Sequence, residues 1–195
     1  MASYPTPAAT RVTSGTPLTI PNFGAMLRGV STQAILDAAW VPAVSALLIV
    51  VAGFVGYKLK QPWLFAALGP TVMMMVANPG HETTRFRAVV VGHLAAIACA
   101  YLALLMLNAA DVPALTSAAK SFSPRIWASG AALAMLALVQ PQLRAHHAPA
   151  AATTLLITLG ALRMSGRTPL ALIGSVVLIA ALAELAAHLR PRKGR

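Results

Sequence analysis

The chain has 195 residues, of which 58% are apolar and only 10% are charged, and its mean hydropathy is +0.74. A soluble domain carries about 25% charged residues, so this composition excludes an ordinary soluble globular protein. The net charge of +11 does not indicate a nucleic-acid-binding protein, because the basic residues lie in short loops and tails without interleaved aromatic residues. We therefore expect a membrane protein with the lipid bilayer, and no nucleic acid, as its partner.

The two ends of the chain are expected to be cytoplasmic tails around a transmembrane domain at residues 33–190. Residues 1–32 are rich in Ser, Thr, Pro and Ala and lack the apolar core of a signal peptide, so they predict a flexible tail. Residues 191–195 form a basic tail. Because positive charge stays on the cytoplasmic side, we expect both termini there and a multi-pass protein of the plasma (cell inner) membrane.

Four apolar segments predict long membrane-spanning helices, at residues 34–57, 87–107, 123–140 and 168–189. A helix needs about 20 apolar residues to cross the hydrocarbon core. The third segment is slightly short, and it can span if its ends reach outward or the bilayer thins locally.

Two further apolar segments, at residues 63–77 and 148–162, are too short to cross easily. Each holds about 15 residues, or roughly 22 Å as a helix. The pair Gly69 and Pro70 predicts a break in the middle of the first segment, and Pro149 suits the first turn of the second. If the short helices cross fully there are six crossings; if they re-enter on one side, four spans remain.

The two halves of the chain, at about residues 34–107 and 123–189, show a faint duplication. LGPTVMMMVA in the first half resembles HAPAAATTLL in the second. Paired interrupted helices of this kind point to the central binding site of a transporter. We predict an all-α, polytopic transmembrane helical bundle with pseudo-duplicated halves, four long spans and two short proline-broken helices.

The start of the second short helix is the first candidate for a binding site. A helix beginning at Pro149 would direct the free N–H groups of Ala150, Ala151 and Ala152 toward His147, and such donors favour an anion. Alternatively, Pro149 simply starts a packed helix.

The matching helix start at Gly69 and Thr71 would contribute to the same site. His93 lies inside a span, where an ionisable residue is either functional or a buried group bonded to a neighbour. We expect His93, His147 and Thr153 to face the ligand.

Basic residues are expected at the entrances, where Arg87 and Arg144 would attract the anion. No metal site is expected, because adjacent histidines such as His146 and His147 rarely chelate one ion. Cys99 is the single cysteine. No nucleophile with a base appears, so we expect no catalytic residues, no cofactor and no enzyme.

These residues carry a resemblance to the HPP family of integral membrane proteins, whose signature typically reads HPPAGATALL. The matching stretch is HAPAAATTLL, in which His147, Pro149 and Thr153 agree, while Ala148 and Ala151 replace a proline and a glycine. A second family pattern, an Arg followed after five residues by His in a Gly-His pair, is similar to Arg87 through Gly92-His93. The resemblance covers about residues 35–190.

The resemblance implies a small multi-span protein and, for photosynthetic members, nitrite transport. We therefore expect a transporter or channel for a small inorganic anion, with nitrite as the first candidate. The alternative is a non-transporting membrane assembly or interaction module. The sequence leaves open whether the chain forms a homo-oligomer.

Overall fold

The structure, a computed structural model, describes residues 32–115, 124–162 and 166–190. The chain divides into two compact units, Met1–Leu36 and Asp37–Arg195. The architecture below is that of the second unit. The tails predicted at residues 1–32 and 191–195 lie outside the described residues, except for Thr32.

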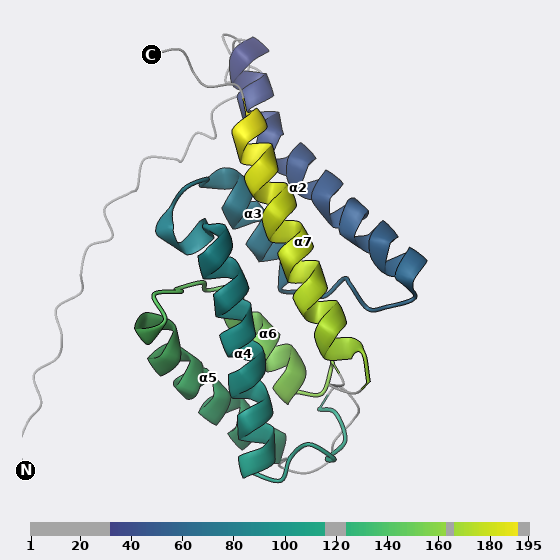
Figure 1. Cartoon of the computed structure of the whole chain (residues 1–195), viewed down its shortest axis with the longest axis vertical. Helices are drawn as coiled ribbons and strands as arrows, with labels where there is room; N and C mark the ends of the chain where they lie inside the picture. The colour runs from purple at the N-terminus through teal and green to yellow at the C-terminus, as the bar shows by residue number, and fades with distance from the viewer. Residues whose placement is uncertain (1–31, 116–123, 163–165, 191–195) are drawn as a thin grey trace, which may run out of the picture. The chain divides into compact units, whose positions relative to one another are not determined.

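The described residues form helices and contain no strand, which confirms the predicted all-α class. In chain order the elements are α2 (Thr32–Leu59), α3 (Leu68–Ala77), the 3₁₀ turn η1 (Glu82–Thr84), α4 (Phe86–Met106), α5 (Pro124–Gln142), α6 (Ala150–Thr158) and α7 (Thr168–Leu189). Helix α4 lies among α5, α6 and α7 (Figure 1) and packs against each of them.

In the part of the chain that is described, three helices are long and apolar enough to cross a membrane: Ala38–Leu59, Phe86–Met106 and Thr168–Leu189. They agree with three of the four predicted spans. The fourth, α5, has 19 residues but does not qualify, because Arg125, Gln140 and Gln142 bring polar side chains to its ends. Four long spans are therefore not confirmed.

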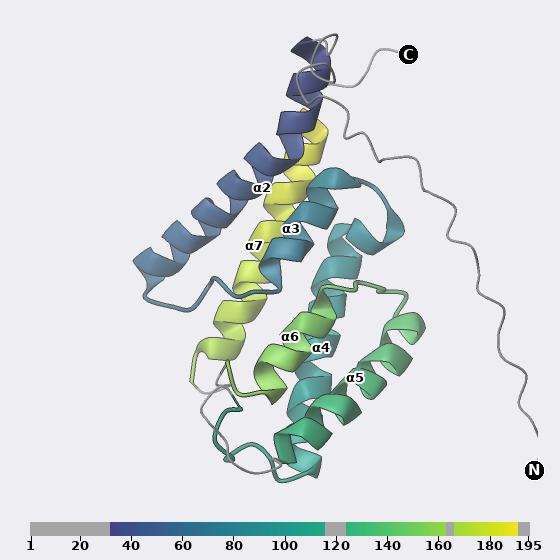
Figure 2. The same cartoon turned by 180° about the vertical axis from the view of Figure 1, so that it is seen from behind.

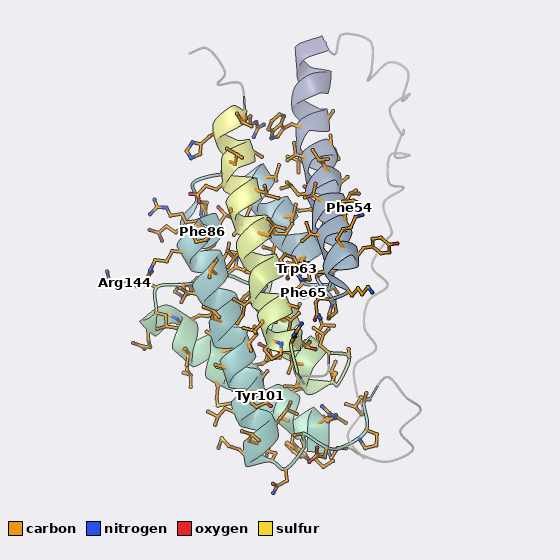
Figure 3. The ribbon with its side chains drawn as sticks, turned by 45° about the vertical axis from the view of Figure 1, so that its right-hand side comes forward. Phe54, Trp63, Phe65, Phe86, Tyr101 and Arg144 are labelled. Carbon is orange, nitrogen blue, oxygen red and sulfur yellow. The ribbon has the colours of Figure 1, made fainter. Side chains whose placement is uncertain are left out.

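The outer faces of the long helices expose large apolar side chains. Phe54 on α2 is 60% exposed, and Tyr101 on α4 is 44% exposed (Figure 3). Apolar surface of this extent is unfavourable in water and suits contact with lipid.

The two short helices are shorter than the sequence predicted. Helix α3 has 10 residues and α6 has nine, or about 15 Å at most, whereas the hydrocarbon core is about 30 Å thick. Pro70 does not break α3, because the helix begins at Leu68 and the proline lies in the first turn, where its missing N–H costs little. Helix α6 starts directly after Pro149 and ends before Gly160, whose φ of 84° is left-handed.

The short helices start near one another and run in opposite directions (Figures 1 and 2). Helix α3 runs from the middle of the unit toward the end where α4 begins, and α6 runs toward the end where α7 begins. Helix α3 packs on α7, and α6 packs on α4 and α5. Both first turns are buried inside the unit, with Leu68 and Thr71 in α3 and Ala150 and Thr153 in α6.

The segment leading into α3 is held by close packing on α2 and α7. A Cβ atom on Gly56 would lie 2.7 Å from the Cβ atom of Trp63, and one on Gly174 would lie 3.2 Å from the indole ring. Figure 3 shows Trp63 and Phe65 on this segment. The indole therefore fits only because both helices carry glycine there, and its packing fixes the start of α3.

Candidate functional site

His93 connects the first turns of the two short helices. Its side chain is 1% exposed, in the second turn of α4. Its Nε2 atom lies 3.1 Å from the Thr71 hydroxyl on α3, and its Nδ1 atom lies 2.8 Å from the Thr153 hydroxyl on α6. The ring of Phe65 packs edge-on against the imidazole, at 6.3 Å between centroids. One imidazole thus holds two helix starts that are far apart in the sequence.

His147 joins the same group of side chains from the segment before α6. It is fully buried, and its Nδ1 atom donates to the Thr83 carbonyl at 2.8 Å. Its Nε2 atom lies 3.2 Å from the Thr71 hydroxyl. The centroids of the His93 and His147 rings are 5.2 Å apart. We call the side chains of Thr71, His93, His147 and Thr153 the histidine–threonine cluster.

With both imidazoles neutral, one arrangement of hydrogens gives every nitrogen and hydroxyl of the cluster a partner. A carbonyl only accepts, so Nδ1 of His147 carries a hydrogen, and in the neutral ring Nε2 then accepts from the Thr71 hydroxyl. Thr71 in turn accepts from Nε2–H of His93, whose Nδ1 accepts from Thr153. In this state each nitrogen and hydroxyl of the cluster already has a protein partner.

The backbone donors at the start of α6 differ from the expectation. The N–H groups of residues 150–152 each donate to the carbonyl three residues earlier, at 3.0–3.1 Å. The Thr71 N–H likewise donates to the Ala67 carbonyl at 3.3 Å. The expectation of free N–H groups at residues 150–152 is therefore wrong for this conformation, because one turn of tight local hydrogen bonds uses them.

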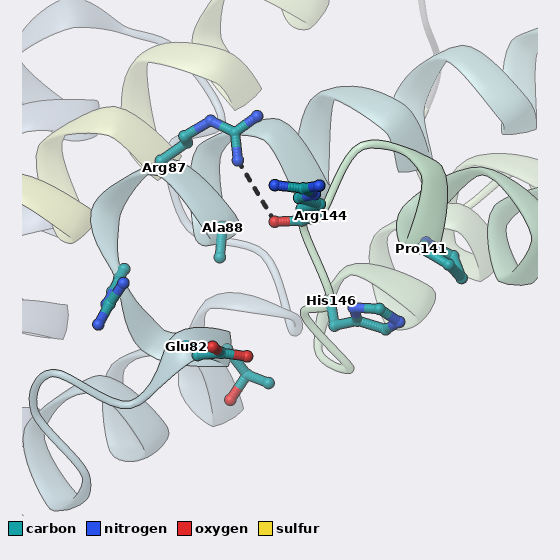
Figure 4. Close-up of a pocket in the computed structure, with 8 residues that line it drawn as sticks. Glu82, Arg87, Ala88, Pro141, Arg144 and His146 are labelled. Atoms are coloured by element: carbon teal, nitrogen blue, oxygen red, sulfur yellow. Dashed lines mark hydrogen bonds between the residues drawn. The ribbon is translucent and has the colours of Figure 1, made fainter.

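A basic cavity of about 500 Å³ lies beside the cluster, at the start of α4 (Figure 4). Its lining residues come from η1, α4 and the segment around the end of α5: Glu82, Thr83, Arg85, Arg87, Ala88, Pro141, Arg144 and His146. Three arginines face one carboxylate there, so the cavity is suited to an anion. Thr83 belongs both to the lining and, through its carbonyl, to the hydrogen bond of His147.

Arg87 and Arg144 lie at this one cavity and not at separate entrances. The Arg87 guanidinium donates to the Arg144 carbonyl at 3.3 Å (Figure 4) and to the Leu143 carbonyl at 3.2 Å. These bonds tie the first turn of α4 to the segment that carries His147. Gln140 adds a third tie, since its Nε2 donates to the His147 carbonyl at 3.1 Å.

The structure brings together most of the residues singled out in the sequence. Thr71, His93, His147 and Thr153 are linked by a chain of hydrogen bonds, and their role in binding stays a prediction. The other predicted residues belong to the adjoining first turns of the short helices: Gly69, Pro149, Ala150 and Ala151. Sequence reasoning missed the anchoring carbonyl of Thr83, and it could not have found it, because any residue type supplies a carbonyl.

Replacing Gly92 by alanine is expected to disturb the cluster through backbone packing. The added Cβ would lie 2.9 Å from the His147 Cβ and 3.2 Å from the Ala145 carbonyl oxygen, so the segment carrying His147 must shift. We expect the free energy of unfolding to fall by about 1–3 kcal/mol, the usual cost of overpacking. Unfolding of the purified protein in detergent measures this.

Gly130→Ala is the matched control for that experiment. Gly130 is also in a helix, but a Cβ there would meet nothing within 4 Å, so its stability should stay the same or rise slightly. If Gly92→Ala is as stable as Gly130→Ala, the close contact between α4 and the His147 segment is not present in the molecule.

Comparison with known proteins agrees with the resemblance seen in the sequence. The family model described as the HPP transmembrane region matches residues 30–193. No curated protein and no solved structure was found to match. The matched region contains all three candidate spans, both short helices and the whole histidine–threonine cluster. The chain therefore belongs to the HPP family of integral membrane proteins.

Proposed function

We propose that this protein is a transporter or channel for a small inorganic anion, with nitrite as the first candidate, and that it is not an enzyme. The observation that carries the proposal is the basic cavity, which lies directly beside a buried pair of histidines. Arginines attract the anion into the cavity, and the histidine–threonine cluster supplies polar groups deeper in the protein.

The half-length helices support the same proposal. Transporters commonly build their binding sites where interrupted helices begin inside the membrane. Here α3 and α6 begin at the cluster, and the position between their first turns is occupied by His93. Opening of the hydrogen bonds in the cluster would release donors from both helix starts for an anion.

Uptake into proteoliposomes tests the proposal. The full-length protein is reconstituted, and the entry of nitrite, nitrate, chloride and formate is measured against empty vesicles. We expect at least one anion to enter faster than it enters empty vesicles, and we expect the largest increase for nitrite. If all four enter at the background rate, the proposed function is wrong.

The satisfied hydrogen bonds favour a second candidate, a non-transporting membrane assembly module. In this alternative the cluster serves only to join α3, α4 and α6, and no anion enters. Thermal unfolding and anion uptake of cluster variants separate the two candidates. If the protein is an assembly module, the variants are less stable and neither they nor the unmodified protein take up anions.

Removing one positive charge from the cavity should slow uptake. We expect Arg144→Gln to lower the rate of anion uptake about 10-fold at low ionic strength, and less at high salt, because steering by charge is screened. The backbone carbonyl that accepts from Arg87 remains in this variant. Lys58→Gln at the end of α2 removes the same charge away from the cavity and is the matched control. Equal rates for the two variants would contradict a role for the cavity in attraction.

The proposal includes the setting of the protein. We place it in the plasma (cell inner) membrane with both termini cytoplasmic, because basic residues follow α7 in the sequence. The lipid bilayer and the anion are its proposed partners. Measuring the molecular mass of the purified protein in detergent would show whether it forms a homo-oligomer.

A further inference from the structure

The Thr71 hydroxyl has three hydrogen-bond partners but only one hydrogen to give. Its oxygen lies 2.8 Å from the Ala67 carbonyl, 3.1 Å from Nε2 of His93 and 3.2 Å from Nε2 of His147. Two arrangements of hydrogens satisfy both imidazole contacts, and they differ by one proton; only the protonated one also places a hydrogen between Thr71 and the Ala67 carbonyl.

In the neutral arrangement Thr71 donates to His147 and accepts from His93, as described above. In the second arrangement His147 gains a proton on Nε2 and donates to Thr71, while the hydroxyl turns to donate to the Ala67 carbonyl. Thr71 then accepts from both imidazoles through its two lone pairs. No nitrogen or hydroxyl loses its partner, so the cluster can take up one proton without moving a heavy atom.

A second proton is disfavoured by the same geometry. The two rings are 5.2 Å apart in a buried site, where like charges repel strongly. The crevice of α4 and α7 residues beside His93 is too narrow for a water molecule to solvate the added charge. The cluster therefore has the capacity for one proton.

We infer that the histidine–threonine cluster binds one proton together with the transported anion, and that the protein is a proton–anion symporter. This inference rests on the proposed anion transport. The proton binds at Nε2 of His147, which is buried and faces Thr71 rather than the cavity, so it reaches and leaves this atom when the hydrogen bonds of the cluster open. For a monoanion the complex of protein, proton and anion carries no charge beyond that of the empty protein.

The surrounding charges explain why the two ligands would bind together. Helices α3 and α6 carry no charged residue, and the charged residues of α5 and α7 lie near helix ends, at Arg125, Glu184 and His188. The charged or titratable groups near His147 line the cavity or adjoin its 3₁₀ turn: His81, Glu82, Arg85, Arg87, Arg144 and His146. Because most of these are basic, they oppose a lone proton on His147, and an anion in the cavity removes that opposition.

The driving force for uptake tests this inference in proteoliposomes. Nitrate is the probe, because it does not cross the bilayer as a neutral acid. We expect an inward proton gradient to drive nitrate accumulation, and a membrane voltage clamped with potassium and valinomycin to have little effect. Accumulation that follows the voltage and ignores the proton gradient would overturn the symport.

Two variants of one residue separate the proton site from general damage to the fold. Thr71→Val keeps the shape but removes the hydroxyl, so we expect the proton gradient to lose its effect on nitrate accumulation. Thr71→Ser keeps the hydroxyl and should retain the effect. If Thr71→Val responds to the proton gradient as the unmodified protein does, the cluster is not the proton site.

A measurement without transport distinguishes failure of the inference from failure of the proposed function. ¹⁵N-histidine NMR of the full chain in detergent, with nitrate present at saturating concentration, follows ring protonation from about pH 8 down to about pH 4. We expect one of the two cluster rings, His147, to become doubly protonated while His93 stays neutral. Two protons or none in the pair would overturn the one-proton site, even if anions are transported; one proton with no transport would instead contradict the proposed function.

Discussion

Replacing Arg125 by methionine is expected to lower the free energy of unfolding by about 3–5 kcal/mol, the largest stability loss that we predict. The side chain is 6% exposed at the start of α5. Its guanidinium donates to the carbonyls of Val112 at 2.8 Å, Thr158 at 2.8 Å and Ala110 at 2.9 Å. Methionine fills similar space but leaves these carbonyls without a charged donor.

The position of Arg125 explains why the loss should be large. Thr158 is the last residue of α6, where helix carbonyls lack partners and a positive charge is favourable. The same guanidinium also holds the loop that follows α4, so one residue joins three parts of the chain. Ser129, one turn further along α5, adds a hydrogen bond of 2.8 Å to the Thr158 hydroxyl.

Unfolding of the purified protein by SDS or heat measures the effect. Arg167→Met is the matched control, because that arginine is exposed before α7 and its loss should change the stability by less than about 0.5 kcal/mol. Arg125→Lys keeps the charge but cannot reach all three carbonyls, so its stability should lie between those of Arg125→Met and Arg167→Met. An Arg125→Met protein as stable as Arg167→Met would show that the three bonds do not hold the helices together.

The long helices were predictable because their signal is local. A run without charged residues, ended by Tyr57 and Lys58, predicted the end of the first span near the observed Leu59. The start of α7 at Thr168 was predicted in the same way. The span at residues 123–140 was predicted from its apolar interior although it is slightly short, and polar residues at both of its ends reduce its hydropathy, so it does not qualify.

The short helices were less predictable because their ends depend on tertiary contacts. Pro70 was expected to interrupt a helix, and in the structure the segment that contains Trp63 is packed and non-helical and α3 begins at Leu68, so the proline falls in the first turn. Arg125 was not singled out in the sequence. Its partners lie 13 to 33 residues away, and no sequence pattern gives that distance.

The contacts within the cluster agree with a general physical argument. A polar group inside an apolar segment must find a partner, but serines such as Ser129 and Ser175 are buried as well, so the sequence does not select which groups pair. The sequence could not say whether the groups of the cluster remain free for a ligand. In the structure they satisfy one another, and this makes opening of the cluster part of any transport mechanism.

Replacing His93 by leucine is expected to lower anion uptake by about 10- to 100-fold, which corresponds to the loss of one or two hydrogen bonds to a charged ligand. The imidazole bridges Thr71 and Thr153, so its removal disconnects the two helix starts. Stability should fall less than for Arg125→Met. The Thr71 hydroxyl can still donate to His147 or to the Ala67 carbonyl, and leucine fills the buried volume.

This difference between flux and stability decides between the transporter and the assembly module. A transporter loses uptake in His93→Leu while most of its stability remains, and Thr153→Val should show the same pattern because it removes the partner of Nδ1. A module shows no uptake above empty vesicles in any variant and loses only stability. His188→Gln, at the exposed end of α7, is the matched histidine control and should behave as the unmodified protein. If His93→Leu transports as fast as His188→Gln, the cluster does not contact the anion, and the cavity alone must account for any uptake.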